Sequence, residues 1–415
     1  ASWILLAALG AGLVVAWRRR CLLLRLWQRR RRAILLVLAV TAAVWLLFVA
    51  VRASNPAIFW GEKPMDFSFL NAFLRAGSWP PNEPWMAGMP LHYYYFGQVL
   101  AAFPILLSGC TGGVGYNLMA ATVPALGAAV LAAIGMVLAG RRSWLSSLVL
   151  PALVLLTGNL AWPWLLHHAG QGKWFDLWWA TSRVIPGFAI DEYPLWTALF
   201  ADLHGHFIAL PLLIATLAWG WICVAGSSSR WPAAAAFCGL FAAALVATNP
   251  WDLFILVGAL AAGTVTAARR KIAGLGRLAV AGGFSLLAAA PFIVELLAGF
   301  NAGAGERGLF LTDADFAPAW AVLRHFGLFL VPLAALAIAT LGRRSWLVLP
   351  LGSLGVLAGL SFNSSAAALA LAGGALFAVV IFTSGDRLIR LGWALASFGC
   401  LGIAACERFT LIDRM

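Results

Sequence analysis

The chain has 415 residues, of which 63% are hydrophobic and only 10% are charged, and this balance excludes an ordinary soluble globular protein. A formal net charge of +13 would suit nucleic acid, but most of the cations are arginines in short groups between apolar segments, where membrane topology signals belong. The composition therefore predicts an all-α polytopic membrane protein that does not bind nucleic acid.

Apolar segments are spread along the whole chain. About twenty consecutive apolar residues are needed to cross the hydrocarbon core of a bilayer. The predicted spans are 2–17, 33–51, 116–140, 144–166, 194–225, 232–248, 251–268, 273–299, 319–341, 346–360, 366–383 and 391–406. The segment 97–112 is also apolar but short. We therefore expect about 12–13 transmembrane or partial helices with large extracytoplasmic loops.

The first two spans form a predicted N-terminal anchor, residues 1–51. No basic region precedes the first span and no cleavage site follows it, which favours a membrane anchor over a signal peptide. Residues 18–32 between the two spans hold eight arginines and no acid. Because arginine-rich loops stay in the cytoplasm, loop one, residues 52–96, is expected outside.

The segment 97–112 decides the topology of everything after it. If it crossed the membrane, Arg141, Arg142 and the later basic turns would all lie outside. If it dips in and returns, 19 cations and one acid lie inside, against nine cations and 14 acids outside or at the outer ends of helices. The second arrangement obeys the positive-inside rule, so the sequence predicts a re-entrant or partial helix and an acidic extracytoplasmic layer.

Loop one carries three charged residues close together, Glu62, Lys63 and Asp66. They are near enough in sequence to converge on one ligand, or they are solvated charges at the membrane interface. Prolines and tryptophans favour an ordered loop at the interface, with a surface helix over 67–75.

Three tyrosines, Tyr93, Tyr94 and Tyr95, follow His92. Tyrosines at the headgroup level are common as an aromatic belt. Three consecutive rings in an extended or irregular segment point in different directions, so at least one is expected to face protein or ligand. Stacking on a sugar, with the phenol donating a hydrogen bond, is the functional alternative.

Loop two, residues 167–193, ends in Asp191 and Glu192, and the next span carries three more polar residues. On a continuous helix over 194–225, Asp202 and His206 share a face, whereas His204 is turned away from both. Ionisable residues at that depth favour a functional role, and the alternative is a self-satisfied pair that orients helices.

One further acid, Asp252, follows Asn249 and Pro250 between two spans. Asn249 as a helix N-cap, with Pro250 at the first helical position, accounts for the motif structurally. Asp252 is expected to point toward the acidic extracytoplasmic layer.

These motifs in order, the loop-one charges, the tyrosine triplet with Phe96-Gly97, the Asp202 to His206 segment and Asn249 to Asp252, carry a resemblance. The chain resembles the YYY-domain family of bacterial and archaeal membrane proteins, a family of unknown function, from about residue 52 to the end. The resemblance implies a YYY-type transmembrane domain over 52–415, truncated at its C-terminus. That architecture is in turn similar to the C-type (GT-C) membrane glycosyltransferases.

The second resemblance implies transfer of a sugar from a polyprenyl-phosphate donor to an acceptor at the extracytoplasmic face, close to membrane lipids. Such a reaction needs a base for the acceptor proton and cations or a metal for the departing phosphate. Asp66, with Glu62, is the expected base, and magnesium or manganese is a candidate cofactor. The expected substrate-binding residues are Lys63, His92, Tyr93, Tyr94, Tyr95, Asp191, Glu192, Asp202, His204, His206 and Asp252.

Two other classes of function stay open from the sequence. In a transporter or proton-coupled carrier, Asp202 and His206 would relay an ion or a proton. Alternating access would also call for polar residues on the cytoplasmic half, where beside the arginines only Asp386 lies. A noncatalytic membrane assembly subunit is the third class.

Overall fold

The computed structural model describes residues 2–413 apart from 78, 87, 139–143, 169–173, 186–189, 226–229, 269, 303–306, 312–316, 343–345, 347, 362–363 and 407–408. Several arginines of the predicted cytoplasmic turns, Arg141, Arg142, Arg269, Arg343 and Arg344, therefore lie outside the described residues. The chain forms two compact units, Ala1–Thr157 with Ala198–Ile214, and Gly158–Thr197 with Ala215–Met415.

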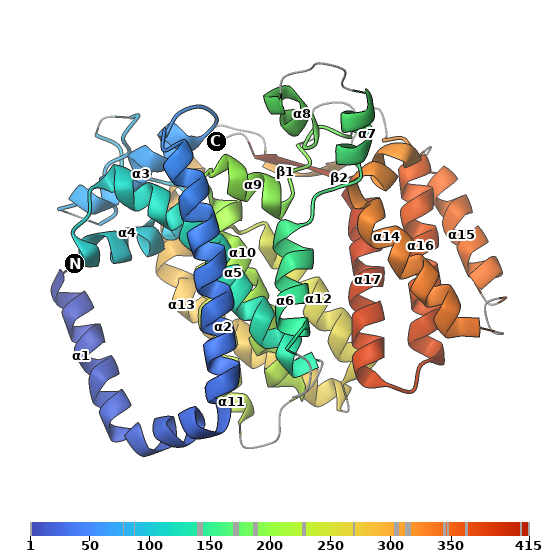
Figure 1. The fold of residues 1–415 in the computed structure, drawn as a ribbon, viewed down its shortest axis with the longest axis horizontal. Coiled ribbons are helices and arrows are strands. Elements are labelled where there is room, and N and C mark those ends of the chain that lie inside the picture. The colour runs from blue at the N-terminus through green and yellow to red at the C-terminus, as the bar shows by residue number, and fades with distance from the viewer. Residues whose placement is uncertain are drawn as a thin grey trace. The chain divides into compact units, whose positions relative to one another are not determined.

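The first unit contains the N-terminal helices and the start of α10 (Figure 1). Its elements are α1 (Ser2–Arg18), α2 (Arg20–Ser54), α3 (Lys63–Arg75), α4 (Phe96–Ser108), α5 (Gly112–Leu138), α6 (Ser146–Pro151) and the π-helical turn η1 (Ala152–Leu156). The second unit starts at Gly158, just after η1. Two helices, α9 (Pro194–Phe200) and α10 (Gly205–Ala225), each contribute residues to both units.

The second unit holds the remaining elements. They are α7 (Ala161–His168), α8 (Trp174–Ala180), α11 (Trp231–Thr248), α12 (Asp252–Ala267), α13 (Lys271–Ala302), β1 (Arg307–Leu311), α14 (Ala319–Leu341), α15 (Val348–Ser361), α16 (Ser365–Thr383), α17 (Arg387–Cys406) and β2 (Phe409–Asp413). The strands β1 and β2 form one antiparallel pair, which the sequence did not predict. α17 packs against α12 and α16, and α15 and α14 also pack on α16.

The all-α polytopic architecture predicted from the sequence is confirmed. In the described part of the chain, eight helices are long and apolar enough to cross a membrane, or nine if α6 with η1 and α7 form one span. The eight are α2, α5, α10, α11, α13, α14, α16 and α17. α4 has 13 residues, so it is about 20 Å long and shorter than a bilayer core.

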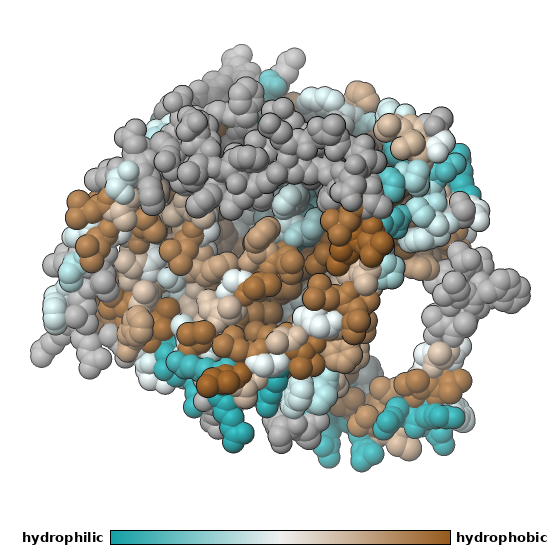
Figure 2. All heavy atoms as spheres, turned by 180° about the vertical axis from the view of Figure 1, so that it is seen from behind, coloured by the Kyte–Doolittle hydropathy of each residue, from teal (hydrophilic) through white to brown (hydrophobic). Residues whose placement is uncertain are grey.

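The outward faces of these helices are apolar, as a lipid environment requires. Leu46 on α2 is 60% exposed and Phe382 on α16 is 87% exposed, a pattern that would be costly for a protein in water. Figure 2 shows apolar residues in brown over much of one face, and hydrophilic residues in teal where α1 meets α2 at the lower right.

Within the first unit, α2 packs along α5, and the two ends of α2 differ in their neighbours. The arginine-rich residues 20–32, expected as a loop, are helical and form the start of α2, and α3 and α4 lie toward its other end (Figure 1). At that end the Arg52 guanidinium donates to Asn117 Oδ1 at 2.7 Å and to the Ala57 carbonyl at 3.2 Å. The predicted separation of the loop-one acids from the first arginine turn is therefore present in this unit.

Three expectations from the sequence were wrong in detail. The surface helix expected over 67–75 begins earlier, at Lys63. The continuous helix expected over 194–225 is interrupted at residues 201–204, between α9 and α10. Asn249 ends α11 as its C-cap and does not cap α12, which begins at Asp252.

Candidate functional site

The segment ahead of α3 turns sharply and places Glu62 at the start of the helix. Trp60 and Gly61 have φ angles of 76° and 65°, a region that residues with a Cβ rarely adopt. A Cβ on Gly61 would lie 2.7 Å from the Phe200 ring, so a larger residue there would displace that ring. Pro64 follows in the first helical turn, where a missing N–H costs no hydrogen bond.

Three charged side chains leave the first turn of α3 in very different surroundings. Glu62 and Asp66 are four residues apart and share a helix face, and the Asp66 N–H donates to the Glu62 carbonyl at 3.0 Å. Asp66 is fully buried, whereas the Glu62 side chain is 59% exposed. Lys63 is buried, with Nζ 3.5 Å from the centroid of the Phe200 ring. Of the two predicted catalytic carboxylates, only Glu62 is accessible to a substrate.

The break between α9 and α10 brings a second set of polar residues to the same place. Ala201 has a φ of 58°, an unusual value for a residue with a Cβ. The buried Tyr116 hydroxyl holds this turn, since it donates to the Ala201 carbonyl at 3.4 Å and accepts from the Leu203 N–H at 3.0 Å. His204 therefore points into the first unit, and the prediction that it is turned away was wrong.

His204 joins the two carboxylates of α3. Its Nδ1 lies 3.1 Å from Glu62 Oε2 and 3.3 Å from the carboxylate oxygens of Asp66. The buried Gln98 amide donates to Asp66 Oδ1 at 3.0 Å and fixes that carboxylate from the other side. One imidazole thus connects a buried acid with an exposed acid.

Two tyrosines of the triplet, Tyr93 and Tyr94, lie against this imidazole. The Tyr93 hydroxyl lies 3.3 Å from His204 Nε2, and the Tyr93 ring stacks on Tyr94 with centroids 4.0 Å apart. Tyr95 faces the opposite way and is 2% exposed, with its ring packed on Phe73. Tyr93 and Tyr94 therefore belong to the site, while Tyr95 belongs to the core that supports it.

Burial and mutual charge shift the proton affinities of three groups in the site. Burial, together with the charge of Asp66 and a hydrogen bond to it, raises the pKa of Asp202 to about 8. Burial lowers the pKa of His204, but the hydrogen bond with Asp66 and the charges of Asp66, Glu62 and Asp202 outweigh it and raise the pKa to about 9. Burial lowers the pKa of Lys63 to about 8. At neutral pH the site thus holds a protonated Asp202 and an imidazolium.

The donor set does not fit the divalent metal considered from the sequence. Across the described ranges, no three His, Cys, Asp or Glu side chains come together in a way that could hold a metal ion. The space between Glu62 and Asp66 is taken by His204 Nδ1, which lies within 3.3 Å of an oxygen of each carboxylate.

A comparison of the chain with known protein families gives a match. The family described as "Uncharacterized membrane protein (DUF2298)" matches residues 1–415. The chain belongs to this family. No curated protein and no solved structure matches it. The DUF2298 match agrees with the resemblance to the YYY-domain family. It also covers residues 1–51, whereas that resemblance began at about residue 52. Together with the apolar helices, it makes the chain a multi-pass membrane protein.

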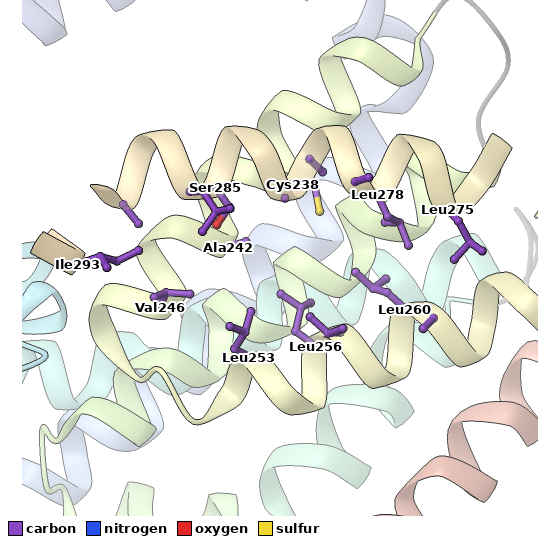
Figure 3. Close-up of a pocket in the computed structure, with 17 residues that line it drawn as sticks. Cys238, Ala242, Val246, Leu253, Leu256, Leu260, Leu275, Leu278, Ser285 and Ile293 are labelled. Carbon is purple, nitrogen blue, oxygen red and sulfur yellow. The ribbon is translucent and has the colours of Figure 1, made fainter. Parts of the chain in front are cut away.

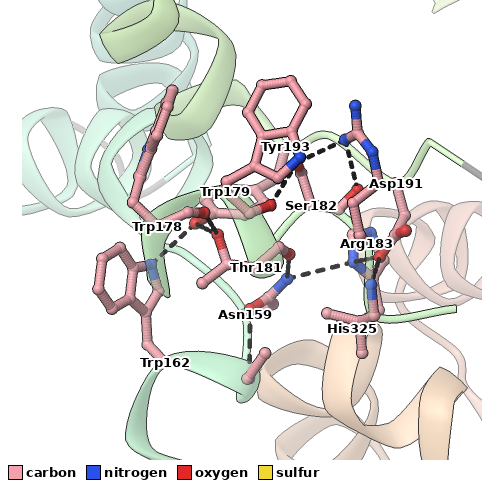
Figure 4. A network of polar contacts seen from close by, with 12 residues as sticks. Asn159, Trp162, Trp178, Trp179, Thr181, Ser182, Arg183, Asp191, Tyr193 and His325 are labelled. Carbon is pink, nitrogen blue, oxygen red and sulfur yellow. Dashed lines mark hydrogen bonds and ion pairs between the residues drawn. The ribbon is translucent and has the colours of Figure 1, made fainter. Parts of the chain in front are cut away.

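Two of the residues expected to bind substrate in this DUF2298 chain, Asp191 and Glu192, belong to the second unit and serve local structure. Figure 4 shows Asp191 in its polar network. Asp191 Oδ2 accepts from the Val184 N–H at 3.0 Å and lies 3.2 Å from His325 Nδ1. Glu192 Oε2 accepts from the Thr197 hydroxyl at 3.0 Å. Both carboxylates hold the end of loop two in place.

The rest of this network is made by uncharged groups. The Tyr193 hydroxyl lies 2.9 Å from the Thr181 hydroxyl and accepts from the Trp162 indole at 2.8 Å. The Asn159 amide donates to the Thr181 carbonyl at 2.6 Å and lies 3.3 Å from His325 Nδ1. The sequence did not indicate His325 as part of this network, because it lies in an apolar span, far along the chain from Asn159 and Asp191.

The other predicted residues have separate places. His206 is exposed on the first turn of α10, with its ring centroid 5.4 Å from that of His204, so it does not share the buried position of Asp202. Within the described residues the buried His92 Nδ1 has no hydrogen-bond partner. Asp252 is the first residue of α12 in the second unit. Two site residues missed from the sequence are Gln98 and Tyr116, which are neutral and lie in apolar segments.

Proposed function

We propose that this protein is a membrane enzyme that transfers a sugar from a polyprenyl-phosphate donor to an acceptor hydroxyl at the extracytoplasmic face. The observation that carries the proposal is the convergence on His204 of an exposed carboxylate and a buried carboxylate from the start of α3 and of a tyrosine from a second segment of the first unit. Ionisable groups with shifted pKa values gathered in one place are typical of catalytic sites.

In this reaction the acceptor oxygen attacks the anomeric carbon of the sugar while the bond from that carbon to the phosphate oxygen breaks. Glu62 takes the proton of the acceptor hydroxyl, because it is the exposed carboxylate of the site. Asp66 acts through His204 and does not touch the acceptor, since it is fully buried. This assigns to Glu62 the role that the sequence gave first to Asp66.

The electron pair of the broken bond leaves with the polyprenyl phosphate. The His204 imidazolium and the Lys63 ammonium are the cations of the site, and preorganised cations stabilise a departing phosphate. Asp66 and Gln98 hold the imidazole in place for that role. Tyr93 and Tyr94 offer stacked rings next to His204, a surface on which a sugar face can pack.

The test replaces Glu62 and a second carboxylate of the same loop. A strain with the gene deleted is complemented with wild type, Glu62→Gln or the control Glu83→Gln, and its glycolipids and glycoproteins are profiled. Glu62→Gln should lower formation of the missing product at least about a hundredfold. Glu83→Gln should restore it, because Glu83 accepts the nearby Trp85 N–H within loop one, away from His204.

Bound-lipid analysis completes the experiment. A polyprenyl phosphate that copurifies with wild type supports the enzyme. Either of two results contradicts it: no change of any glycan on deletion, or full restoration of the missing product by Glu62→Gln.

A proton-coupled carrier is the second candidate, favoured by one observation. Asp202 is 6% exposed and holds a proton at neutral pH, as a proton-binding group of a carrier would. Under this alternative Asp202→Asn abolishes proton-coupled uptake in vesicles, whereas Glu62→Gln leaves it intact. The enzyme predicts no such uptake in wild type.

A further inference from the structure

An apolar groove lies between α12 and α13 in the second unit, with α11 behind it (Figure 3). Its volume is about 410 Å³. Leu253, Val257 and Leu260 line it from α12, and Leu275, Leu278 and Leu286 from α13. The polar side chains among its lining residues are small, the Ser285 hydroxyl and the Cys238 thiol. The groove therefore suits a hydrocarbon and not a polar substrate.

The groove exists because α13 packs closely on α11. A Cβ on Gly239 of α11 would lie 2.6 Å from the Ala281 carbonyl oxygen, so the two helix backbones approach as small residues allow. α12 and α13 are farther apart, and the leucine side chains of both helices line the space between them. The gap thus follows from a fixed packing of α11 on α13.

The groove is long enough for a lipid chain, which spans one leaflet of the bilayer, and it is open along its side. From Leu275 to Ile293 it follows 18 residues of α13, about 27 Å at 1.5 Å per residue, close to the thickness of a bilayer core. Val257 and Leu286 are 58% and 66% exposed. Because α11 and α13 are candidate membrane spans, what reaches this open side is the hydrocarbon of the bilayer. A volume of 410 Å³ over this length is a narrow slot that admits a single chain.

Positive charge marks one end of the groove. Lys271 lies four residues before Leu275, on the same face of α13, and Arg270 precedes it. Both residues are exposed. A basic group beside a membrane helix attracts anionic lipid headgroups. The apolar slot and its basic end together match the two parts of an anionic phospholipid.

We propose that the groove between α12 and α13 binds one acyl chain of an anionic phospholipid, whose phosphate lies at Lys271 and Arg270. This site is separate from the chemistry proposed for the first unit and does not depend on it. The lipid occupies the gap that the packing of α11 on α13 leaves, and so supports α12 against α13.

The test uses two adjacent glycines of α13. Gly282 lines the groove, whereas Gly283 does not, and a Cβ at either position meets no atom within 4 Å. Gly282→Phe should fill the groove, and Gly283→Phe is the matched control for adding a phenyl ring to α13. Lys271→Gln tests the basic end, with Arg387→Gln at the start of α17 as its control.

The purified proteins are titrated in detergent with phosphatidylglycerol or phosphatidylcholine of identical chains, and retained lipids are counted by native mass spectrometry. Wild type and Gly283→Phe should retain one phosphatidylglycerol that Gly282→Phe loses. Lys271→Gln should weaken retention of phosphatidylglycerol about fivefold relative to phosphatidylcholine, while Arg387→Gln leaves it unchanged. Equal retention of both lipids by wild type, or unchanged retention by Gly282→Phe, would overturn the proposal.

Discussion

At the scale of single residues, His204 has an unusual electrostatic position. It is 8% exposed, yet two carboxylates within 3.3 Å keep it charged. Burial alone would favour the neutral imidazole, so the acids must outweigh the cost of removing a charged ring from water. Asp202 takes the complementary form and holds a proton. The protonation of His204 and that of Asp202 therefore depend on each other and on the charge of Asp66.

This coupling predicts how stability depends on pH. Folding raises the pKa of His204 from 6.5 to about 9, so its stabilising contribution is present below pH 6.5 and is lost as the pH rises through 9. The raised pKa of Asp202 also makes stability fall as the pH rises toward 8. Lys63 acts in the opposite direction, because its lowered pKa makes stability rise with pH only between about 8 and 10.5.

We therefore expect the melting temperature of the detergent-solubilised protein, at one scan rate, to fall between pH 6.5 and 8. Asp202→Asn should reduce this slope, and Glu83→Gln should leave it as in wild type. A melting temperature independent of pH in wild type, or an unchanged slope in Asp202→Asn, would show that these groups do not titrate as described.

At the scale of elements, hydropathy was enough to locate the helices but not their interruptions. Each predicted span has a helical counterpart, because apolar length is a local property that a membrane-spanning helix needs. The break at residues 201–204 depends on Tyr116, about 85 residues earlier in the chain. Nothing local in the Ala201 to His204 segment forbids a helix. Asp66 and Glu62 were found from the sequence, but their meeting with His204 comes from long-range packing.

The turn before α3 gives a prediction for an element. Gly61 and Gly88 both lie in loop one with positive φ, at 65° and 83°, so alanine is strained at either position. Only at Gly61 does an added Cβ also meet another group, the Phe200 ring against which Lys63 packs. Gly61→Ala should therefore destabilise the protein by about 1–3 kcal/mol more than Gly88→Ala. Thermal unfolding in detergent measures the difference, and equal losses would mean that Phe200 moves freely.

At the scale of the whole molecule, the proposed sugar transfer has one condition, that the α3 site and the arginine-rich start of α2 face opposite sides of a membrane. α4 is central to this condition, because it has 13 residues and ends at Gly109 in a left-handed conformation. A helix of that length does not reach across a bilayer by itself. The predicted dip and return of 97–112 agrees with this length, and the topology itself remains a prediction.

Native cysteines can test the topology directly. Cys21 is exposed beside the arginine-rich turn, and Cys110 is partly exposed just after α4. In variants that keep only one of these cysteines, a membrane-impermeant maleimide applied to intact spheroplasts should label Cys110 but not Cys21. Opening the membrane should then expose Cys21, which controls for its reactivity. If α4 crossed completely, Cys110 would also stay protected until the membrane is opened, and Asn117 with the following helix would have the reverse orientation. The positive-inside rule would then fail at every later basic turn, so labelling of Cys110 tests the predicted dip and return of 97–112.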